Sequence, residues 1–278
     1  MFHKNKVISY SLFGYGKATA DNCFEYNSYF RGLTINIRLA RLLYPDWMVV
    51  LHIDNESYQA YESFLNELPI KIVVCDDAPL TKAMLWRMKP CFEDYEAVLC
   101  RDIDSPLTYR EAQAVEYWIN SSKCVHAITD SISHNVPMMG GMIGFKPKDF
   151  IGTCGYSNWD EMINSSNFDW SRKGADQDFL NQHIYPKYAQ PQIDSITQHY
   201  ISGMANTYLS DYHNQIPDID IPNVPKILQQ SNDVCGHIGS AGWYETALFK
   251  FLRKHWDVFE DLLILEKKHS KIFYWANE

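Results

Sequence analysis

Short apolar runs alternate with longer segments of helical period through the first half of the chain. The runs typical of strands are 7–13, 48–53, 70–75, 97–101, 123–128 and 142–145. Between them, apolar side chains recur every three or four positions at 26–43, 58–68, 81–89 and 109–119, which is the period of an amphipathic helix. Strands that alternate with helices predict an α/β fold with a mostly parallel sheet and right-handed crossovers.

The strand-like run 97–101 leads directly into two carboxylates. Asp102 and Asp104 are separated by Ile103, and Pro106 ends the segment because proline cannot donate to a strand ladder. Side chains alternate along an extended chain, so both carboxylates are expected on one side, with Ile103 in the core. Two neighbouring carboxylates repel each other, and a hard divalent cation bound between them is the simplest way to offset this repulsion. Such a cation can bind a diphosphate. The alternative interpretation is that Asp102-Ile103-Asp104 is part of a solvated turn.

The same residues allow a phosphatase hypothesis. Asp-x-Asp-Ser is how a haloacid-dehalogenase-like phosphatase begins, with the first Asp, here Asp102, as the nucleophile. That motif normally lies on the first strand of its domain. Several strand and helix patterns precede Asp102 in this chain, which counts against the hypothesis.

Two later stretches carry further candidate chemistry. Gly140 and Gly141 stand just before the apolar run 142–145. Because glycine has no side chain, a ligand could approach the backbone closely here; the alternative is a tight turn before a core strand. Asp176 and Gln177 stand where a new helical pattern begins. We expect them at the mouth of the sheet, and the alternative for Asp176 is a carboxylate that complements the helix N-terminus.

Three other positions are candidates on weaker grounds. His237 lies in a glycine-rich stretch and has room to reach a metal, while Gly239 exposes a backbone N–H; a structural histidine is the alternative. Arg87 is a candidate phosphate contact or part of a solvated face. Asp130 follows the run 123–128 and is expected near the same end of the sheet.

Composition narrows the class of protein. The chain has 278 residues and a net charge of −9, which argues against a nucleic-acid-binding surface. Seven cysteines without a Cys-x-x-Cys pair favour a reducing compartment and no structural zinc. No apolar stretch reaches the ~18 residues of a membrane span. We therefore expect no transmembrane segment and a cytoplasmic location, with a place at the periphery of a membrane left open.

Four stretches, taken in order, resemble the GT-A family of nucleotide-sugar glycosyltransferases. They are 101–105, 139–142, 174–178 and 237–239, which read Arg-Asp-Ile-Asp-Ser, Met-Gly-Gly-Met, Gly-Ala-Asp-Gln-Asp and His-Ile-Gly. The resemblance covers roughly residues 7–242. It is greatest to small bacterial and large-virus enzymes of this type and more distant to glycogenin-like retaining transferases. It implies a single Rossmann-like GT-A domain over 1–278, with a nucleotide-donor half 1–106, an acceptor half 107–242 and a C-terminal helical segment 243–278.

The resemblance also implies the residues that bind the donor. Asp102, Asp104 and His237 match positions that hold Mn²⁺ (or Mg²⁺) on the diphosphate. Glycogenin-like chains carry a phosphate-contacting lysine after the late histidine, which this chain lacks, so Arg87 or Arg101 would replace it. The implied nucleotide-sugar contacts, of which the first four come from the first strand, are Ser9, Tyr10, Ser11, Phe13, Arg87, Arg101, Gly140, Gly141 and Gly239.

The implied reaction moves a hexosyl or pentosyl group from a nucleoside-diphosphate sugar, UDP-sugars first, to a glycan, lipid-linked sugar or protein. In an inverting enzyme Asp130 or Asp176 would take the acceptor proton. In a retaining enzyme Asp176 or Gln177 would lie beneath the reacting sugar, and the glycogenin-like features favour retention. A non-catalytic protein that binds nucleotide sugars or glycans is the remaining alternative.

Overall fold

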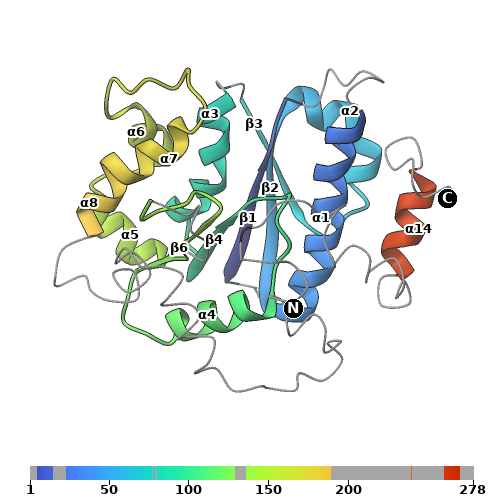
Figure 1. The fold of residues 1–278 in the computed structure, drawn as a ribbon, viewed down its shortest axis with the longest axis horizontal. Helices are drawn as coiled ribbons and strands as arrows, with labels where there is room; N and C mark the ends of the chain where they lie inside the picture. Colours follow the sequence, from blue (N-terminus) through green and yellow to red (C-terminus); the bar gives the residue numbers. More distant parts are fainter. Residues whose placement is uncertain are drawn as a thin grey trace.

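The computed structural model of the chain describes residues 5–14, 23–76, 78, 80–128, 136–188, 239 and 260–269. These residues form a six-stranded sheet with helices on both faces, a Rossmann-like α/β arrangement (Figure 1). The mostly parallel sheet expected from the sequence is thus confirmed. The strands are β1 Lys6–Leu12, β2 Trp47–Asp54, β3 Lys71–Cys75, β4 Ala97–Arg101, β5 Val125–Ala127 and β6 Met142–Phe145.

The order of the strands creates a switch point in the middle of the sheet. The order is β3-β2-β1-β4-β6-β5, and the first four strands run parallel. From β1 the chain moves outward through β2 and β3, then returns to the other side of β1 as β4. In open α/β sheets, ligands bind outside the carboxyl ends of the strands at such a point.

The last two strands depart from the parallel pattern. β6 pairs antiparallel with β4, and β5 pairs antiparallel with β6. Strand β5 is only 3 residues long and β6 only 4, so neither run shows in its own sequence which way it pairs.

The helices of the two faces come from different parts of the chain (Figure 1). One face carries α1 Cys23–Leu43, α2 Asn55–Leu65 and α4 Tyr109–Ile119, and α14 Glu260–Lys268 packs outside α1. The other face carries α3 Leu80–Ala83, a 3₁₀ segment Met84–Phe92, α5 Pro147–Cys154, α6 Trp159–Asn164, α7 Ala175–Phe179, a π-helical segment Leu180–Ile184 and α8 Tyr185–Tyr188.

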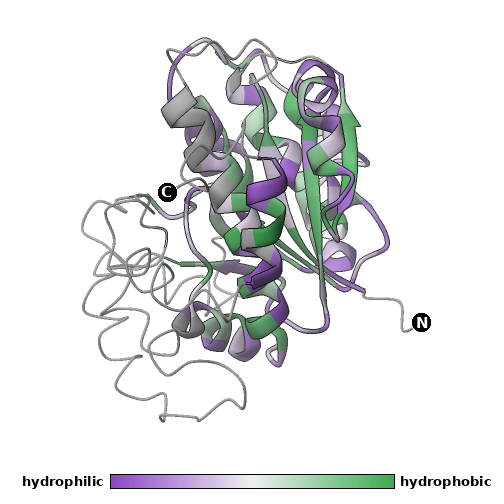
Figure 2. Cartoon of the chain, turned by 90° about the vertical axis from the view of Figure 1, so that its right-hand side faces the viewer, coloured by the Kyte–Doolittle hydropathy of each residue, from purple (hydrophilic) through white to green (hydrophobic). Residues whose placement is uncertain are grey.

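Each face of the sheet has its own apolar core, because successive side chains of a strand point to opposite faces. On β1, Ile8, Tyr10 and Leu12 belong to the core under α1 and α2. On β4, Val98 and Cys100 belong to the core on the opposite face. The strands are accordingly the most hydrophobic elements in Figure 2.

Several local predictions are confirmed or corrected. Asp54, at the end of β2, accepts a hydrogen bond from the Ser57 N–H at 2.8 Å and caps α2. The helix expected at 81–89 is instead a short α-helix followed by 3₁₀ turns that continue through Pro90. Helix α5 begins with Pro147 at its first turn and was not predicted.

None of the helices in the described ranges is both long and apolar enough to cross a membrane. The described cysteines are all free thiols: Cys75, Cys91, Cys100, Cys124 and Cys154.

Candidate functional site

A cavity of about 670 Å³ opens at the carboxyl ends of β1 and β4, at the switch point of the sheet. We call it the strand-end cavity. β1 and the residues after it contribute Ser11, Leu12 and Phe13, and the turn after β4 contributes Asp102, Ile103 and Asp104. Its remaining lining residues are Tyr29, Thr81, Met84, Arg87, Trp170, Ser171, Lys173 and Gly174.

Asp102 and Asp104 (the Asp pair) both line this cavity, and Ile103 between them is buried in the core. Asp102 remains 42% exposed on its side chain and forms an ion pair with the Arg87 guanidinium, whose side chain is only 5% exposed. Arg87 also lies 3.7 Å from the carboxylate of Asp176. One buried cation is thus shared by two carboxylates, one of which faces the cavity.

Burial controls the protonation of these groups. Burial and, after it, the neighbouring charge of Asp102 raise the pKa of the Asp104 carboxyl to about 6. Burial also raises the pKa of Asp176, against the opposing effect of Arg87. Burial disfavours the charged form of Arg87, but Asp102 and Asp176 outweigh it, so the pKa of Arg87 is raised. Arg87 therefore stays charged, and this one buried cation lies among the three carboxylates of Asp102, Asp104 and Asp176.

The pair Gly140-Gly141 packs directly against these charged groups. A Cβ on Gly141 would overlap the Asp102 carboxylate, and a Cβ on Gly140 would overlap the Arg87 guanidinium. The absence of both side chains is what lets the backbone before β6 approach Asp102 and Arg87 so closely. The structure assigns the two glycines this steric role.

The turn that carries the Asp pair is held by Asn36 of α1, a residue that the sequence reasoning missed. Its side-chain amide donates to the carbonyl oxygens of Ile103 at 3.0 Å and Ser105 at 2.9 Å, and its oxygen accepts from the Leu107 N–H at 2.9 Å. Asn36 is fully buried. A buried amide that satisfies three backbone groups fixes the path of residues 103–107.

A second asparagine, Asn181, holds the segment that leads to the glycine pair. Its oxygen accepts from the Met138 N–H at 2.9 Å, and its amide donates to the carbonyl oxygens of Met138 at 2.8 Å and Gln177 at 2.7 Å. This side chain therefore ties Met138, two residues before the glycine pair, to Gln177 of α7. Asn36 and Asn181 act from opposite faces of the sheet.

Ser11 links β1 to the segment that carries Arg87. Its hydroxyl oxygen accepts from the Arg87 N–H at 2.9 Å and its hydroxyl donates to the Met84 carbonyl at 3.3 Å. Ser11 and Phe13 line the strand-end cavity. The structure thus places these two predicted residues beside Arg87 and the Asp pair.

Other predicted residues lie elsewhere. Tyr10 is fully buried in the core under α1 and α2 and is not among the residues that line the strand-end cavity. Ser9 is also buried, with its hydroxyl 3.3 Å from Nδ1 of His52. Arg101 is buried in an ion pair with Glu111 and donates to the Ile143 carbonyl at 2.8 Å. Arg101 therefore fastens β4 to α4 and β6, and Arg87 is the arginine of the cavity.

Of the remaining predicted residues, the structure describes Gln177 and Gly239 but not Asp130 and His237. Gln177 is part of α7 and partly exposed. Gly239 has a φ of +81° and lies against the side chain of Met142, the first residue of β6. Asp130 and His237 lie outside the described residues.

The donor set of the Asp pair suits a hard divalent cation. No three His, Cys, Asp or Glu side chains converge as a metal site within the described ranges. Mg²⁺ sites commonly use one or two carboxylates and take their other ligands from water and substrate phosphates. Burial raises the pKa of Asp104 most, and the charge of Asp102 adds to it; a cation between the two carboxylates would offset both effects.

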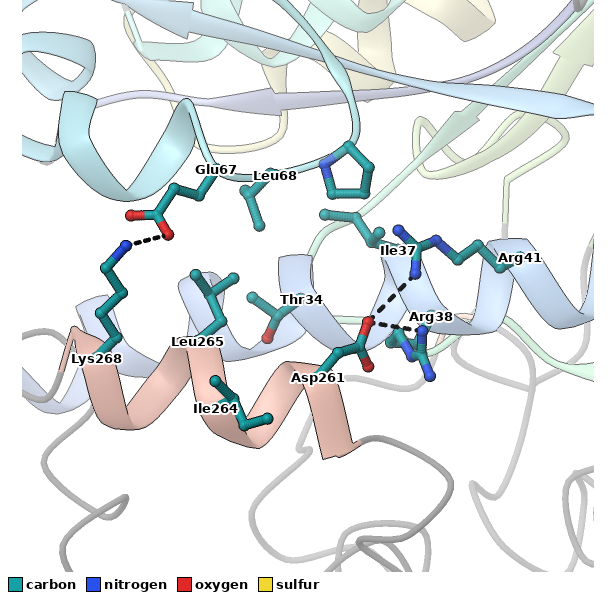
Figure 3. Close-up of a pocket in the computed structure, with 11 residues that line it drawn as sticks. Thr34, Ile37, Arg38, Arg41, Glu67, Leu68, Asp261, Ile264, Leu265 and Lys268 are labelled. Carbon is teal, nitrogen blue, oxygen red and sulfur yellow. Dashed lines mark hydrogen bonds and ion pairs between the residues drawn. The ribbon is translucent and has the colours of Figure 1, made fainter.

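A second cavity, of about 410 Å³, lies away from the strand ends, between α1, the turn after α2 and α14 (Figure 3). Asp261 of α14 accepts hydrogen bonds from Arg38 at 2.8 Å and Arg41 at 3.3 Å. Near the other end of α14, Lys268 pairs with Glu67 at 2.6 Å (Figure 3). Exposed ion pairs of this kind contribute little stability each. The cavity lies where α14 packs against α1 and the turn after α2.

Comparisons with known proteins give only weak likenesses. No family model matches the chain, and no curated protein matches it. Among solved structures, 4-diphosphocytidyl-2C-methyl-D-erythritol synthase from Anaerococcus prevotii is 14% identical, with a TM-score of 0.36 over 74% of this chain and 97% of that one. Mouse xyloside xylosyltransferase 1 in its apo form is 10% identical, with a TM-score of 0.35 over 66% of this chain and 82% of that one. Neither likeness assigns a function, which has to be argued from the site.

Proposed function

We propose that this chain is a metal-dependent glycosyltransferase that transfers a sugar from a nucleoside-diphosphate sugar to a hydroxyl acceptor. The observation that carries the proposal is the convergence of Asp102, Asp104 and Arg87 in one cavity at the switch point of the sheet. A cavity of about 670 Å³ is of the size that ligand sites commonly have. Donor and acceptor classes stay as expected from the sequence: UDP-sugars first, and a glycan, lipid-linked sugar or protein.

Each residue of the site has a defined task in this proposal. The Asp pair would hold Mn²⁺ or Mg²⁺, which, when bound, neutralises the charge that develops on the leaving diphosphate. Arg87 orients Asp102 through their ion pair, and the glycine pair leaves room for both side chains. Phe13, Tyr29 and Trp170 supply aromatic surface to the same cavity, which suits a base or a sugar face.

The reaction breaks the bond between the anomeric carbon and the diphosphate oxygen and forms a bond from that carbon to the acceptor oxygen. The acceptor hydroxyl loses its proton in this exchange. Among described lining residues, the carboxylates are those of the Asp pair, which the proposal assigns to the cation. Asp176 is buried beside Arg87. This arrangement supports retention with the leaving phosphate as proton acceptor, and Asp130 remains the candidate base for inversion.

The phosphatase alternative finds less support. Asp102 follows the fourth strand of the sheet, where that motif is expected after the first. Its carboxylate is also ion-paired with a buried arginine, which lowers its reactivity as a nucleophile.

The test is donor turnover. We expect release of nucleoside diphosphate from one of a panel of UDP-, GDP-, CDP- and dTDP-sugars in the presence of Mn²⁺, and none with EDTA. Asp104→Asn should remove this activity, while Asp46→Asn, an exposed turn residue far along the sequence from the Asp pair, should not. Metal-dependent binding of a donor without turnover over a broad acceptor panel would favour the binding-protein alternative. An acyl-phosphate trapped on Asp102 would favour the phosphatase.

A further inference from the structure

The loop between α6 and α7 contributes a separate part of the strand-end cavity. Trp170, Ser171, Lys173 and Gly174 line the cavity together with the Asp pair, although the two segments are some 70 residues apart in the sequence. Lys173 is exposed. It is the one lining residue of this loop that carries a charge.

The other charged side chains of this loop have local partners. Asp169 accepts hydrogen bonds from the Ser171 N–H at 2.9 Å and its hydroxyl at 2.6 Å. Arg172 forms an ion pair with Asp178 of α7 at 2.6 Å. Within the described ranges no ion pair involves Lys173. The loop is therefore anchored by its own side chains, and no carboxylate in the part of the chain that the structure describes pairs with the ammonium group of Lys173.

The charges of the cavity indicate what Lys173 would meet. Arg87 and Lys173 are the cations among the described lining residues, and Arg87 is already shared by Asp102 and Asp176. A divalent cation held by Asp102 and Asp104 would be shared between these two carboxylates and a bound diphosphate. The diphosphate would then keep negative charge that the cation does not balance, and Lys173 is the lining cation left to meet it.

We propose that Lys173 is a diphosphate-binding residue of the strand-end cavity, an inference that rests on the proposed function. A lysine ammonium is a compact charge on a flexible stem, so from an exposed loop it can follow a phosphate that differs in position between donors. A hydrogen bond from an ammonium to a phosphate oxygen is of the stronger, charge-assisted kind. The chain carries a net charge of −9, so a cation at the cavity mouth also favours the approach of an anion.

The experiment measures Kd for UDP, GDP, CDP and dTDP with Mn²⁺, and for the matching nucleosides, on the full chain. Lys173→Met should weaken the diphosphate that binds best by about tenfold and leave its nucleoside unchanged, because only the phosphates are contacted. Lys173→Arg should restore most of the affinity, since the charge returns. Lys148→Met removes another exposed lysine, on α5 and outside the cavity lining, and should leave both affinities unchanged.

The outcomes separate the two proposals. If the wild-type chain binds none of the four diphosphates, the proposed function fails and the role of Lys173 fails with it. If the wild-type chain binds one of them and Lys173→Met binds it equally well, the role of Lys173 alone is overturned. Equal weakening of nucleoside and diphosphate would also overturn it, because the contact would then not be to phosphate.

Discussion

Gly141 lies so close to Asp102 that a Cβ added to the glycine would occupy the position of the carboxylate. The Asp pair and the glycine pair, about forty residues apart in the sequence, are therefore one steric unit. Register brings them together, because Arg101 at the end of β4 is paired with Met142 at the start of β6.

Gly141→Ala should consequently weaken Mn²⁺-dependent diphosphate binding by at least tenfold. The new methyl group displaces the Asp102 carboxylate, or else the loop shifts at a cost of about 1–3 kcal/mol in the free energy of unfolding. Calorimetry and urea unfolding measure the two effects. Gly152→Ala is the matched control, because a Cβ there meets no atom within 4 Å. On helix α5 it should raise stability by up to about 1 kcal/mol and leave binding unchanged.

Asn36→Ala should lower both stability and metal affinity. The change leaves the Leu107 N–H and the carbonyl oxygens of Ile103 and Ser105 without their buried partner, at a cost of about 2–4 kcal/mol. Because the turn that carries the Asp pair is then loosened, we expect the Kd for Mn²⁺ with diphosphate to rise about tenfold or more.

A matched variant separates these two effects of Asn36. Leu39→Ala removes a buried side chain from the same helix and should cost about 2–5 kcal/mol without touching the turn. Equal losses of metal affinity in both variants would show that general destabilisation, and not the path of residues 103–107, explains the result for Asn36.

The stability of the fold should depend on the protonation of His52. This residue of β2 is fully buried, and burial lowers its pKa from 6.5 to about 3. Between these two values the unfolded chain binds the proton and the folded chain does not, so stability falls as the pH falls below 6.5. From pH 7 to pH 5 the contribution of His52 to this loss is about 2 kcal/mol.

Urea unfolding of the wild-type chain and of His52→Asn at pH 7 and pH 5 measures this contribution. The variant should lose about 2 kcal/mol less than the wild type over the same interval, whatever its absolute stability. An equal loss in both proteins would contradict the assignment, because His52 would then not be the group that takes up the proton.

Much of the sheet could be predicted from the sequence, because it depends on local patterns. Helix α4 runs over the predicted 109–119, and its start is fixed by Thr108, whose hydroxyl oxygen accepts from the Glu111 N–H at 3.1 Å. The Asp pair was found because an apolar strand and a carboxylate pattern adjoin each other in the chain. The antiparallel pairing of β5 and β6 could not be predicted, because strands this short show no sequence pattern that distinguishes parallel from antiparallel pairing.

The supporting residues of the site could not be predicted in the same way. Asn36 lies within a helical pattern, where an asparagine normally suggests a solvated face, and its contacts are 67 to 71 residues away. Asn181 acts at a separation of 43 residues. Tyr10 was expected near a ligand, but it is buried in the core under α1 and α2, and the residues of this strand that line the cavity begin only at Ser11. Counting alternate positions from Ile8, which is apolar and buried, would have assigned Tyr10 to the core.

The proposed function requires the Asp pair to bind a nucleoside diphosphate through a divalent cation. Calorimetric binding of UDP, GDP, CDP and dTDP, each with Mn²⁺ and with EDTA, to the wild-type chain, Asp102→Asn, Asp104→Asn and the control Asp46→Asn measures this. We predict that one diphosphate binds only with Mn²⁺, and that each change within the Asp pair weakens binding by roughly 100-fold while the control does not. Binding that survives EDTA, or that both Asp-pair variants retain, would contradict the claim.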